Sequence, residues 1–269
     1  MSRSRLFVSV LKKSFPSRFI LARLTRVPGF RGLIDKMLFD GDHLIYLPKD
    51  NVVNMNVEIE PPESMVLPSQ VVEHFIQKAR YHWIMNFCIC RESMKCQDYP
   101  RDLGCLFLGE AVLNINPAFG RRVSKEEALE HVRRCREAGL VHLIGRNKLD
   151  TVWLGTGPGE KLLTICNCCP CCCLWLVLPT LHESIGSKVK RMPGVEVRVG
   201  EGCTGCGKCT EVCFVNAITL EDGKAVIGDA CRGCGRCAEA CPVNAITVSF
   251  EPESVERAIE TVDSLVDVE

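Results

Sequence analysis

Apolar side chains in residues 1–40 recur at a loose helical spacing that is interrupted at Pro16. Lysine and arginine occupy many of the positions between them, so the pattern predicts one or two short basic amphipathic helices. Such an arm either packs on its own domain with its charges in water, or docks on a membrane surface or a protein partner. The apolar positions are Leu6, Val8, Val10, Leu11, Phe19, Ile20, Leu21 and Leu24.

Residues 41–68 combine four prolines with short β-forming runs such as 56–59, which predicts a connection of strands and loops. Helical spacing of apolar residues then returns after Ser69, a suitable N-cap residue. We therefore predict a helix that extends from Ser69 to Trp83, just before the first group of cysteines. Its apolar positions are Val72, Phe75, Ile76, Ala79 and Trp83.

A second helix is predicted to begin at Ser124, because Ser124 and Glu127 have the spacing of a capping box, and to end at Gly139. After it, β-forming residues predict three strands. A glycine-rich run joins the last two of them, so helices are followed by a β-wing, and the pattern favours a winged-helix-like domain. The expected strands cover 140–144, 150–154 and 161–165, and the glycine-rich run covers 155–159.

The glycine-rich run is similar in composition to a nucleotide-binding loop. A phosphate loop leads from a strand into the N-terminus of a helix, whereas here we expect a strand to lead to a strand. The sequence therefore argues against nucleotide binding at 155–159.

Composition is that of a folded globular protein, with 46% hydrophobic and 25% charged residues. No stretch approaches the roughly 20 apolar residues that span a bilayer, and the apolar stretch from Leu6 to Leu11 is too short for a signal peptide. Residues 1–40 carry nine lysines and arginines against two aspartates, while the last nineteen residues carry seven acids against Arg257. The two ends thus differ in the sign of their charge.

These patterns divide the chain into four parts and predict an α+β fold. A Cys-rich helical domain, for which the pattern favours a winged-helix-like form, is followed by a module of repeated cysteine motifs. The predicted parts are a basic amphipathic arm (1–40), a Cys-rich α+β domain (41–194), a module of repeated cysteine motifs (195–250) and an acidic helix (251–269).

The repeated motifs are the strongest chemical signal. Cys203 to Thr219 and Cys231 to Thr247 are identical at twelve of seventeen positions, and each contains Cys-x2-Cys-x2-Cys-x3-Cys. Three cysteines at this spacing wrap a tight loop around three corners of a cubane cluster, and glycines at 205, 207, 233 and 235 allow the backbone to approach closely. The fourth cysteine follows the turn away from the loop. A structural zinc module is the alternative, but it leaves the duplication unexplained.

The two motifs resemble those of the bacterial two-[4Fe-4S] ferredoxins, in which the fourth ligand is exchanged between the repeats. The resemblance covers about a fifth of the chain. Phe214 departs from it, because the family usually has proline there, as at Pro242. The resemblance implies a ferredoxin-like two-cluster module, with one cluster on Cys203, Cys206, Cys209 and Cys241, and a second on Cys231, Cys234, Cys237 and Cys213.

Eleven further cysteines lie outside the repeats, which is more than a core of small hydrophobic residues requires. We expect Cys135, on one face of a helix, to be a core residue. For the others we predict at least one additional iron–sulfur cluster. A zinc or other single-metal site, a dithiol or metal-relay role, and purely structural cysteines remain as alternatives. The candidate ligands are Cys88, Cys90, Cys96, Cys105, Cys166, Cys168, Cys169, Cys171, Cys172 and Cys173.

Three other side chains lie near these cysteines in the sequence. Arg91, directly after Cys90, either neutralises the charge of a cluster or is an ordinary surface arginine. His131 and His142, near Cys135, are more often core or surface groups than metal ligands.

The clustering of the cysteines indicates metal ligation in a reducing compartment, so we expect a cytoplasmic protein, or one held peripherally on the cytoplasmic face of a membrane. The whole chain also resembles uncharacterised ferredoxin-domain proteins of anaerobes. The leading hypothesis is an electron carrier for a redox enzyme of anaerobic metabolism, with redox proteins as partners and no nucleic acid. The alternatives are a redox enzyme or activase with an N-terminal cluster as its reaction centre, and a redox-sensing winged-helix regulator that binds DNA.

Overall fold

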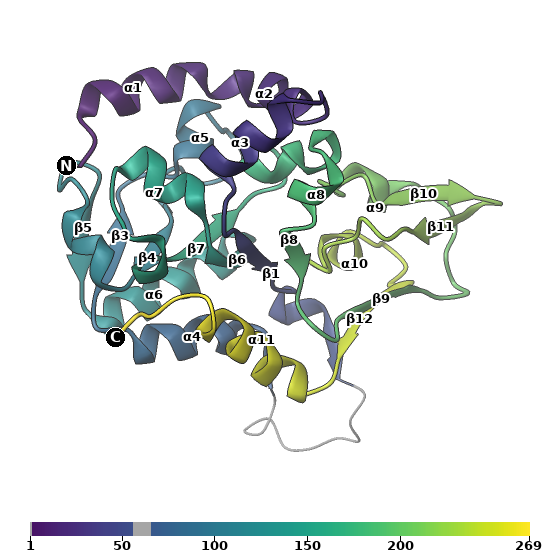
Figure 1. Ribbon diagram of the computed structural model, residues 1–269. Coiled ribbons are helices and arrows are strands. Elements are labelled where there is room, and N and C mark those ends of the chain that lie inside the picture. Colours follow the sequence, from purple (N-terminus) through teal and green to yellow (C-terminus); the bar gives the residue numbers. More distant parts are fainter. Residues whose placement is uncertain (1, 56–65) are drawn as a thin grey trace.

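A seven-stranded sheet forms the centre of the computed structural model, which describes residues 2–55 and 66–269 (Figure 1). The strand order is β5-β3-β4-β7-β6-β1-β8. All neighbours are antiparallel except β1 and β8. The strands are β1 (His43–Tyr46), β3 (His82–Met85), β4 (Leu106–Leu108), β5 (Gly120–Val123), β6 (Val141–Arg146), β7 (Leu163–Cys168) and β8 (Val189–Arg191).

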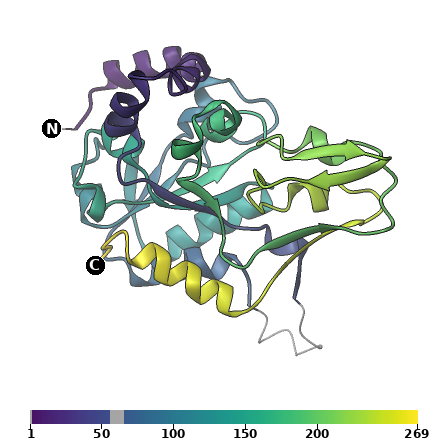
Figure 2. The ribbon, with the colours of Figure 1, turned by 45° about the vertical axis from the view of Figure 1, so that its right-hand side comes forward.

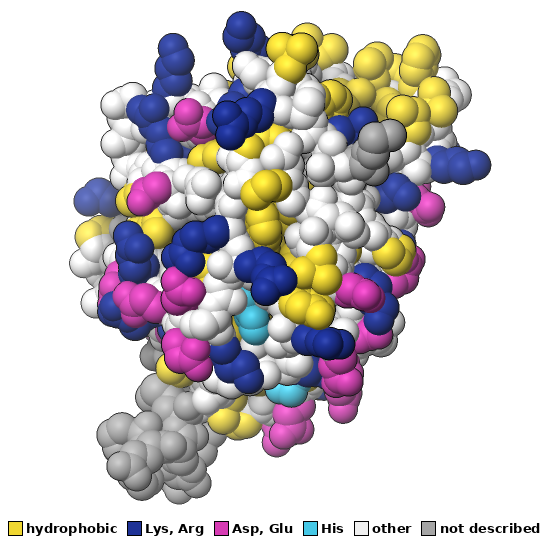
Figure 3. Space-filling view, turned by 90° about the vertical axis from the view of Figure 1, so that its left-hand side faces the viewer, with side chains coloured by type: hydrophobic (Ala, Val, Ile, Leu, Met, Phe, Trp, Pro, Cys, Tyr) yellow, Lys and Arg dark blue, Asp and Glu magenta, His cyan; other side chains and the backbone are white. Residues whose placement is uncertain are grey.

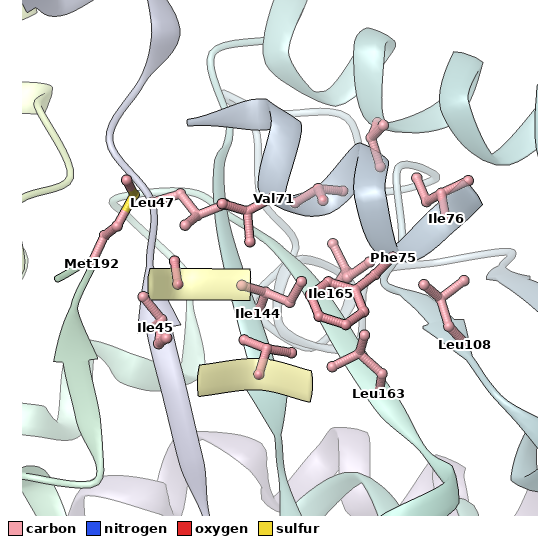
Figure 4. Close-up of a cluster of buried hydrophobic side chains, with 14 of the residues drawn as sticks. Ile45, Leu47, Val71, Phe75, Ile76, Leu108, Ile144, Leu163, Ile165 and Met192 are labelled. Atoms are coloured by element: carbon pink, nitrogen blue, oxygen red, sulfur yellow. The ribbon is translucent and has the colours of Figure 1, made fainter. Parts of the chain in front are cut away.

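One face of this sheet is covered by α4 (Ser69–Lys78), α6 (Lys125–Glu137) and α11 (Glu253–Asp263). Figure 4 shows Phe75 of α4 packed against Leu163 and Ile165 of β7. These side chains are fully buried. Since burial of each large apolar side chain contributes about 1.5–3 kcal/mol, this layer is the main hydrophobic core.

The opposite face is covered by the N-terminal arm and by short helices from the middle of the chain (Figures 1 and 2). In residues 2–40 the arm is helical, as predicted, but it forms three α-helices and a 3-10 helix where one or two helices were expected. Its own side chains Val8, Phe15, Ala22 and Ile34 are buried. The arm consists of α1 (Arg5–Ser14), η1 (Phe15–Ser17), α2 (Arg18–Leu24) and α3 (Phe30–Leu38), and the other elements on this face are α5 (Ile89–Ser93), α7 (Lys148–Leu154), η6 (Leu174–Thr180) and α8 (Glu183–Gly186).

The outer surface of the arm keeps exposed apolar side chains beside its basic ones. In Figure 3 hydrophobic side chains gather along the upper edge of the molecule, among lysines and arginines. Leu6, Ile20 and Leu33 are more than half exposed. Docking of the arm on a membrane or a partner stays a prediction. No helix in residues 2–55 and 66–269 is both long and apolar enough to cross a bilayer.

The repeated cysteine motifs lie at one end of the molecule, on the right in Figure 1. There β12 (Ile246–Phe250) pairs antiparallel with β9 (Glu196–Val199) and parallel with β2 (Val53–Met55), a strand from the N-terminal half. A hairpin of β10 (Ile218–Glu221) and β11 (Lys224–Ile227) lies beside α9 (Lys208–Glu211) and α10 (Arg236–Glu239). Short 3-10 helices cover Asp50–Val52, Glu110–Asn114 and Gly159–Lys161.

The helix expected from Ser69 to Trp83 is shorter than predicted, because it ends at Lys78 and Trp83 belongs to β3. Its N-cap is Pro68, and the backbone N–H of Ser69 donates to Asp50 Oδ1. The helix after Ser124 is confirmed with its capping box, as is a strand after Gly139. The predicted β-type run at 56–59 lies outside the described residues.

The predicted β-wing is wrong. Residues 150–154 lie in α7, because Asn147 caps this helix and Gly155, in the left-handed conformation, ends it. Asp150 also accepts hydrogen bonds from Trp153 Nε1 and Thr164 Oγ1, which holds the helix against β7. The glycine-rich run therefore joins a helix to a strand. That is still not the strand-to-helix passage of a phosphate loop.

Candidate metal centres

The first set of repeated cysteines converges on one small cavity. Cys203, Cys206 and Cys209 come from the loop that enters α9, and Cys241 reaches the same cavity from the end of α10. The backbone N–H groups of Ala225 and Ala245 donate to the sulfurs of Cys203 and Cys241, at 3.4 and 3.2 Å. Such N–H···S bonds stabilise thiolates, which are the ligands of an iron–sulfur cluster.

The second set repeats this arrangement with the roles of the two motifs exchanged. Cys231, Cys234 and Cys237 surround the start of α10, and Cys213 comes from the end of α9. Burial, reinforced by the neighbouring thiols of the set, raises the pKa of Cys237 to about 12. The backbone N–H of Ala217 donates to Cys213 Sγ at 3.2 Å, which matches the bond of Ala245 to Cys241 in the other repeat.

Glycines shape both loops. Gly205 and Gly233 each have φ of +65°, a conformation that residues with a side chain rarely adopt. A Cβ atom on Gly205 would lie 2.3 Å from the carbonyl oxygen of Gly223. At these two positions the backbone lies closer to its neighbours than a residue with a side chain would allow.

A family model described as a 4Fe-4S dicluster domain matches residues 202–246, a segment that includes all eight repeated cysteines. The C-terminal part of the chain contains a ferredoxin-type 4Fe-4S domain. Two converging sets of four thiols, with amides directed at their sulfurs, fit the ligand requirement of such clusters. No curated protein and no solved structure matches the chain.

Outside the ferredoxin-type domain, the cysteines separate into two groups. The first, which we call the four-thiol site, consists of Cys96, Cys169, Cys171 and Cys172, and their sulfur atoms all lie within 4.8 Å of one another. Cys96 follows α5, and the other three follow β7. Three of the residues are buried and Cys171 is exposed, so this site reaches the surface.

The second group surrounds a cavity of about 310 Å³, which we call the six-thiol cavity. Its thiols form three pairs. Cys105 Sγ and Cys166 Sγ lie 3.8 Å apart. Hydrogen bonds join Cys88 to Cys90 and Cys168 to Cys173. The remaining wall is mostly apolar, and α1 and α2 of the arm supply part of it. The six residues are Cys88, Cys90, Cys105, Cys166, Cys168 and Cys173, and Cys169 of the four-thiol site borders the same cavity.

Strand pairing explains why these residues meet. In β4 and β7, Leu106 lies opposite Ile165, a register that places Cys105 next to Cys166. Cys166 and Cys168 are two residues apart on β7, so both side chains point to the cavity face of the sheet. After β7 the chain turns. Cys169 borders both sites, Cys171 and Cys172 belong to the four-thiol site, and Cys173 returns to the cavity.

Arg91 lies between the two groups and is fully buried, so the interpretation of it as a surface arginine is wrong. It donates to the carbonyl oxygens of Pro100 and Asn167, each at 2.7 Å, and to that of Leu103. Burial lowers the pKa of Arg91, but the nearby thiols, chiefly Cys88 and Cys169, outweigh this effect and raise it above the ordinary value.

Ionisation of the cavity thiols follows from their contacts. A hydrogen bond from Cys90, with support from Arg91, lowers the pKa of Cys88 to about 6 despite its burial. The contacts of Cys88 thus favour its thiolate form. Because metal ions and clusters bind the thiolate form, the structure has a ligand ready at this position.

Arg18 brings a second positive charge to the cavity, and the sequence pattern alone did not single it out. Its side chain is 9% exposed, and its guanidinium lies over the rings of Phe15 and Phe19, at 4.4 and 4.5 Å. Within the described part of the chain, its Nε has no hydrogen-bond partner. Burial lowers the pKa of Arg18, and the thiols of Cys90 and Cys173 oppose that effect.

The six-thiol cavity touches the ferredoxin-type domain through aromatic and cationic side chains. Tyr46 OH lies 3.9 Å from Cys173 Sγ, and its ring centre is 4.9 Å from that of Phe214. Phe214 directly follows Cys213. Arg236, which lies between Cys234 and Cys237 in sequence, donates to the carbonyl oxygen of Cys168. The second cysteine set is therefore the one that packs against the cavity.

Other candidates lie outside both groups. Cys135 is fully buried in a hydrophobic cluster, as expected of a core residue. His131 and His142 are buried and hydrogen bonded to Gly104 O and Asn167 Oδ1. Burial lowers the pKa of His142 to about 4, so it is neutral in the core.

Proposed function

We propose that this chain is an iron–sulfur electron-transfer protein that passes electrons to or from a redox enzyme. Two [4Fe-4S] clusters occupy the ferredoxin-type domain, on the crossed cysteine sets, and a further cluster occupies the six-thiol cavity. When bound, such clusters supply one-electron storage at potentials that the surrounding protein tunes. The ferredoxin-type domain and the many grouped cysteines support an iron–sulfur redox role.

The observation that carries the proposal is the contact between the second cysteine set and the cavity. Phe214, next to Cys213, contacts Tyr46, which in turn lies 3.9 Å from Cys173 Sγ. Arg236 donates to the carbonyl oxygen of Cys168 at the cavity wall. Phe214, Tyr46, Arg236 and Cys168 are all buried. The two redox sites therefore share a dry, tightly packed boundary, which keeps them close to each other and keeps solvent from the path between them.

The cavity fits a negatively charged cluster with thiolate ligands. A cubane needs four cysteine ligands, and the six thiols of the cavity exceed that number. Arg18 and Arg91 supply positive charge, and among residues 2–55 and 66–269 neither forms an ion pair with a carboxylate. A buried cation without an anionic partner is costly, so an anionic cluster beside Arg18 supplies the missing partner.

Metal analysis of the full chain, purified without oxygen, tests the proposal. We expect about twelve irons and a similar amount of sulfide, in three groups of about four. Replacement of Cys168 and Cys173 by alanine removes about four irons and one set of paramagnetic resonance signals from the reduced protein, and leaves the signals of the ferredoxin-type domain. Cys135→Ala is the matched control, since it removes another buried thiol and keeps all the iron.

A colourless protein with zinc on the eight repeated cysteines would contradict the carrier role altogether. Iron only in the ferredoxin-type domain would instead remove the cluster proposed for the cavity.

A redox enzyme is the second candidate, because the cavity extends beyond its thiols. Phe7, Leu11 and Trp153 line an apolar part of the cavity next to the six cysteines. An apolar wall of this kind suits a small organic molecule. Turnover of a small molecule by the purified protein with a reduced carrier would favour the enzyme. Without turnover, reversible reduction alone supports the carrier.

The DNA-binding alternative lacks one strand of its predicted β-wing, because residues 150–154 lie in α7. Some of the cations on and beside α6 are also engaged with acids: Arg121 pairs with Glu127, and Arg133 with Glu130 and Glu137. The cytoplasmic location stays a prediction.

A further inference from the structure

The four-thiol site differs from the cluster sites in its size. Cys171 Sγ lies 3.6 Å from both Cys96 Sγ and Cys172 Sγ, and the four sulfur atoms are mutually within 4.8 Å. In a tetrahedral thiolate complex with bonds of about 2.3 Å, neighbouring sulfurs lie about 3.8 Å apart. The observed spacing is thus that of four thiolates around one ion.

A cubane needs more room, because four irons and four sulfides stand between its cysteine ligands. In residues 2–55 and 66–269, no other set of three or more metal-ligating side chains brings its ligand atoms so close together. The eight cysteines of the ferredoxin-type domain are among these residues, and they do not meet that spacing. The distances between sulfur atoms therefore separate the four-thiol site from the cysteine sets of the ferredoxin-type domain.

The local chain geometry also matches a thiolate–metal loop. Cys169 and Cys172 have the two-residue separation common in zinc sites, and the backbone N–H of Cys172 donates to Cys169 Sγ at 3.3 Å. Backbone N–H groups of Asp98 and Tyr99 point at the sulfur of Cys96. Each loop thus orients its own ligand before any ion binds.

Charge around the site is balanced on its buried side. Four thiolates around a divalent ion leave two negative charges, and the fully buried guanidinium of Arg91 contacts Cys169. The other side reaches solvent through Cys171, so the remaining charge is partly solvated.

We propose that Cys96, Cys169, Cys171 and Cys172 bind a single zinc ion that is separate from every iron–sulfur cluster. All four positions of the tetrahedron are taken by protein sulfurs, which is the arrangement of structural zinc sites. The ion joins the loop after α5 to the loop after β7. Since Cys168 and Cys173 flank the second loop, the ion also holds two walls of the six-thiol cavity in place.

The test is metal analysis of the full chain together with the variant C171A. Because Cys171 is exposed, its truncation leaves no buried void, and the fold is expected to survive. We expect about one zinc per chain in the wild type, and loss of that zinc from C171A to a competing chelator at least tenfold faster, with iron and sulfide unchanged. Cys135→Ala, in the same hydrophobic cluster, keeps its zinc.

Cobalt in place of zinc gives a second readout, because a tetrahedral thiolate site produces sulfur-to-cobalt charge-transfer bands that C171A weakens. Loss of about four irons and their sulfide from C171A, with no zinc in the wild type, would overturn the proposal and assign a cluster to this site. A single iron without sulfide would also overturn it. Absence of iron from the cavity or the ferredoxin-type domain bears only on the proposed function.

Discussion

The ferredoxin-type domain and the Cys-rich N-terminal region both gather thiols, but by different means. In the domain, three cysteines of each set come from one short loop, and only one arrives from the other repeat. In the N-terminal region, the six-thiol cavity draws on segments from Cys88 to Cys173, which meet through the register of β4 and β7. Local backbone geometry dominates the first region, and sheet packing dominates the second.

This difference also affects solvent exposure. Cys206 of the ferredoxin-type domain is exposed, whereas Cys168 and Cys173 of the cavity are buried. Thiols held by a short loop tolerate solvent, since the loop itself orients them. Thiols held by packing need a dry and rigid surrounding, and a substitution in that surrounding has a larger expected effect.

The largest effect is expected for Arg91→Met. This change removes a fully buried cation and leaves the carbonyl oxygens of Pro100, Asn167 and Leu103 without their donor. We expect a loss of about 3–5 kcal/mol in the free energy of unfolding, measured by thermal or denaturant unfolding followed by circular dichroism. Arg134→Met, at an exposed position on α6, is the control and changes stability by less than about 0.5 kcal/mol.

Equal stability of the two arginine variants would show that the buried contacts of Arg91 do not hold the N-terminal thiols in position. The contrast between the two regions would then fail.

An intermediate effect is expected in the ferredoxin-type loops. Gly205 and Gly207 both have positive φ, so alanine costs about 1–2 kcal/mol at either position. At Gly205 the added Cβ also meets the carbonyl oxygen of Gly223 at 2.3 Å, while at Gly207 its nearest neighbour is a Leu220 methyl carbon at 3.7 Å. Gly205→Ala should therefore lower the temperature at which the visible cluster absorbance bleaches by more than Gly207→Ala does.

If Gly207→Ala bleaches at the lower temperature, close backbone approach is not the property that distinguishes these loops. Equal bleaching temperatures would leave backbone conformation as the whole effect.

The smallest effect on stability is expected at the boundary between the regions. Phe214→Leu removes the aromatic contact with Tyr46, which is worth about 0.5–1.5 kcal/mol, and keeps every cysteine. Iron content should stay at the wild-type value, while electrons supplied to the ferredoxin-type domain reach the cavity more slowly in rapid-mixing measurements. Phe30→Leu, at an exposed site on α3, is the control. An unchanged rate in Phe214→Leu would show that this contact is not part of the path.

Several local elements were predictable from the sequence because their signals are short-range. The capping box at Ser124 marks a helix, and the glycine-rich cysteine loops repeat a complete motif. The prediction failed where capping and a contact with β7 override propensity: residues 150–154 favour a strand, but the Asn147 cap and the bonds of Asp150 to Trp153 and Thr164 fix them as α7. Trp83 has helical spacing from the preceding residues, yet it pairs with Phe107 and Arg122 in the sheet.

The candidate site shows the same division. The ten N-terminal cysteines were recognisable as candidate ligands from their number and clustering, but their separation into a four-thiol site and a six-thiol cavity was not. Arg18 carried no signal in the sequence, since nothing marks one arginine of a basic arm as the buried one.

The amino-acid sequence by itself determined the chemistry of this protein: thiol-rich loops, duplicated spacing and a ferredoxin-type 4Fe-4S domain, all of which depend on residues close together in the chain. Only the tertiary structure decided which distant thiols share a centre, which arginines are buried beside them, and that Phe214 joins the domain to the cavity. The reason is physical: loop conformation depends on neighbouring residues, whereas the position of a side chain across a sheet depends on strand register and on the core beneath it.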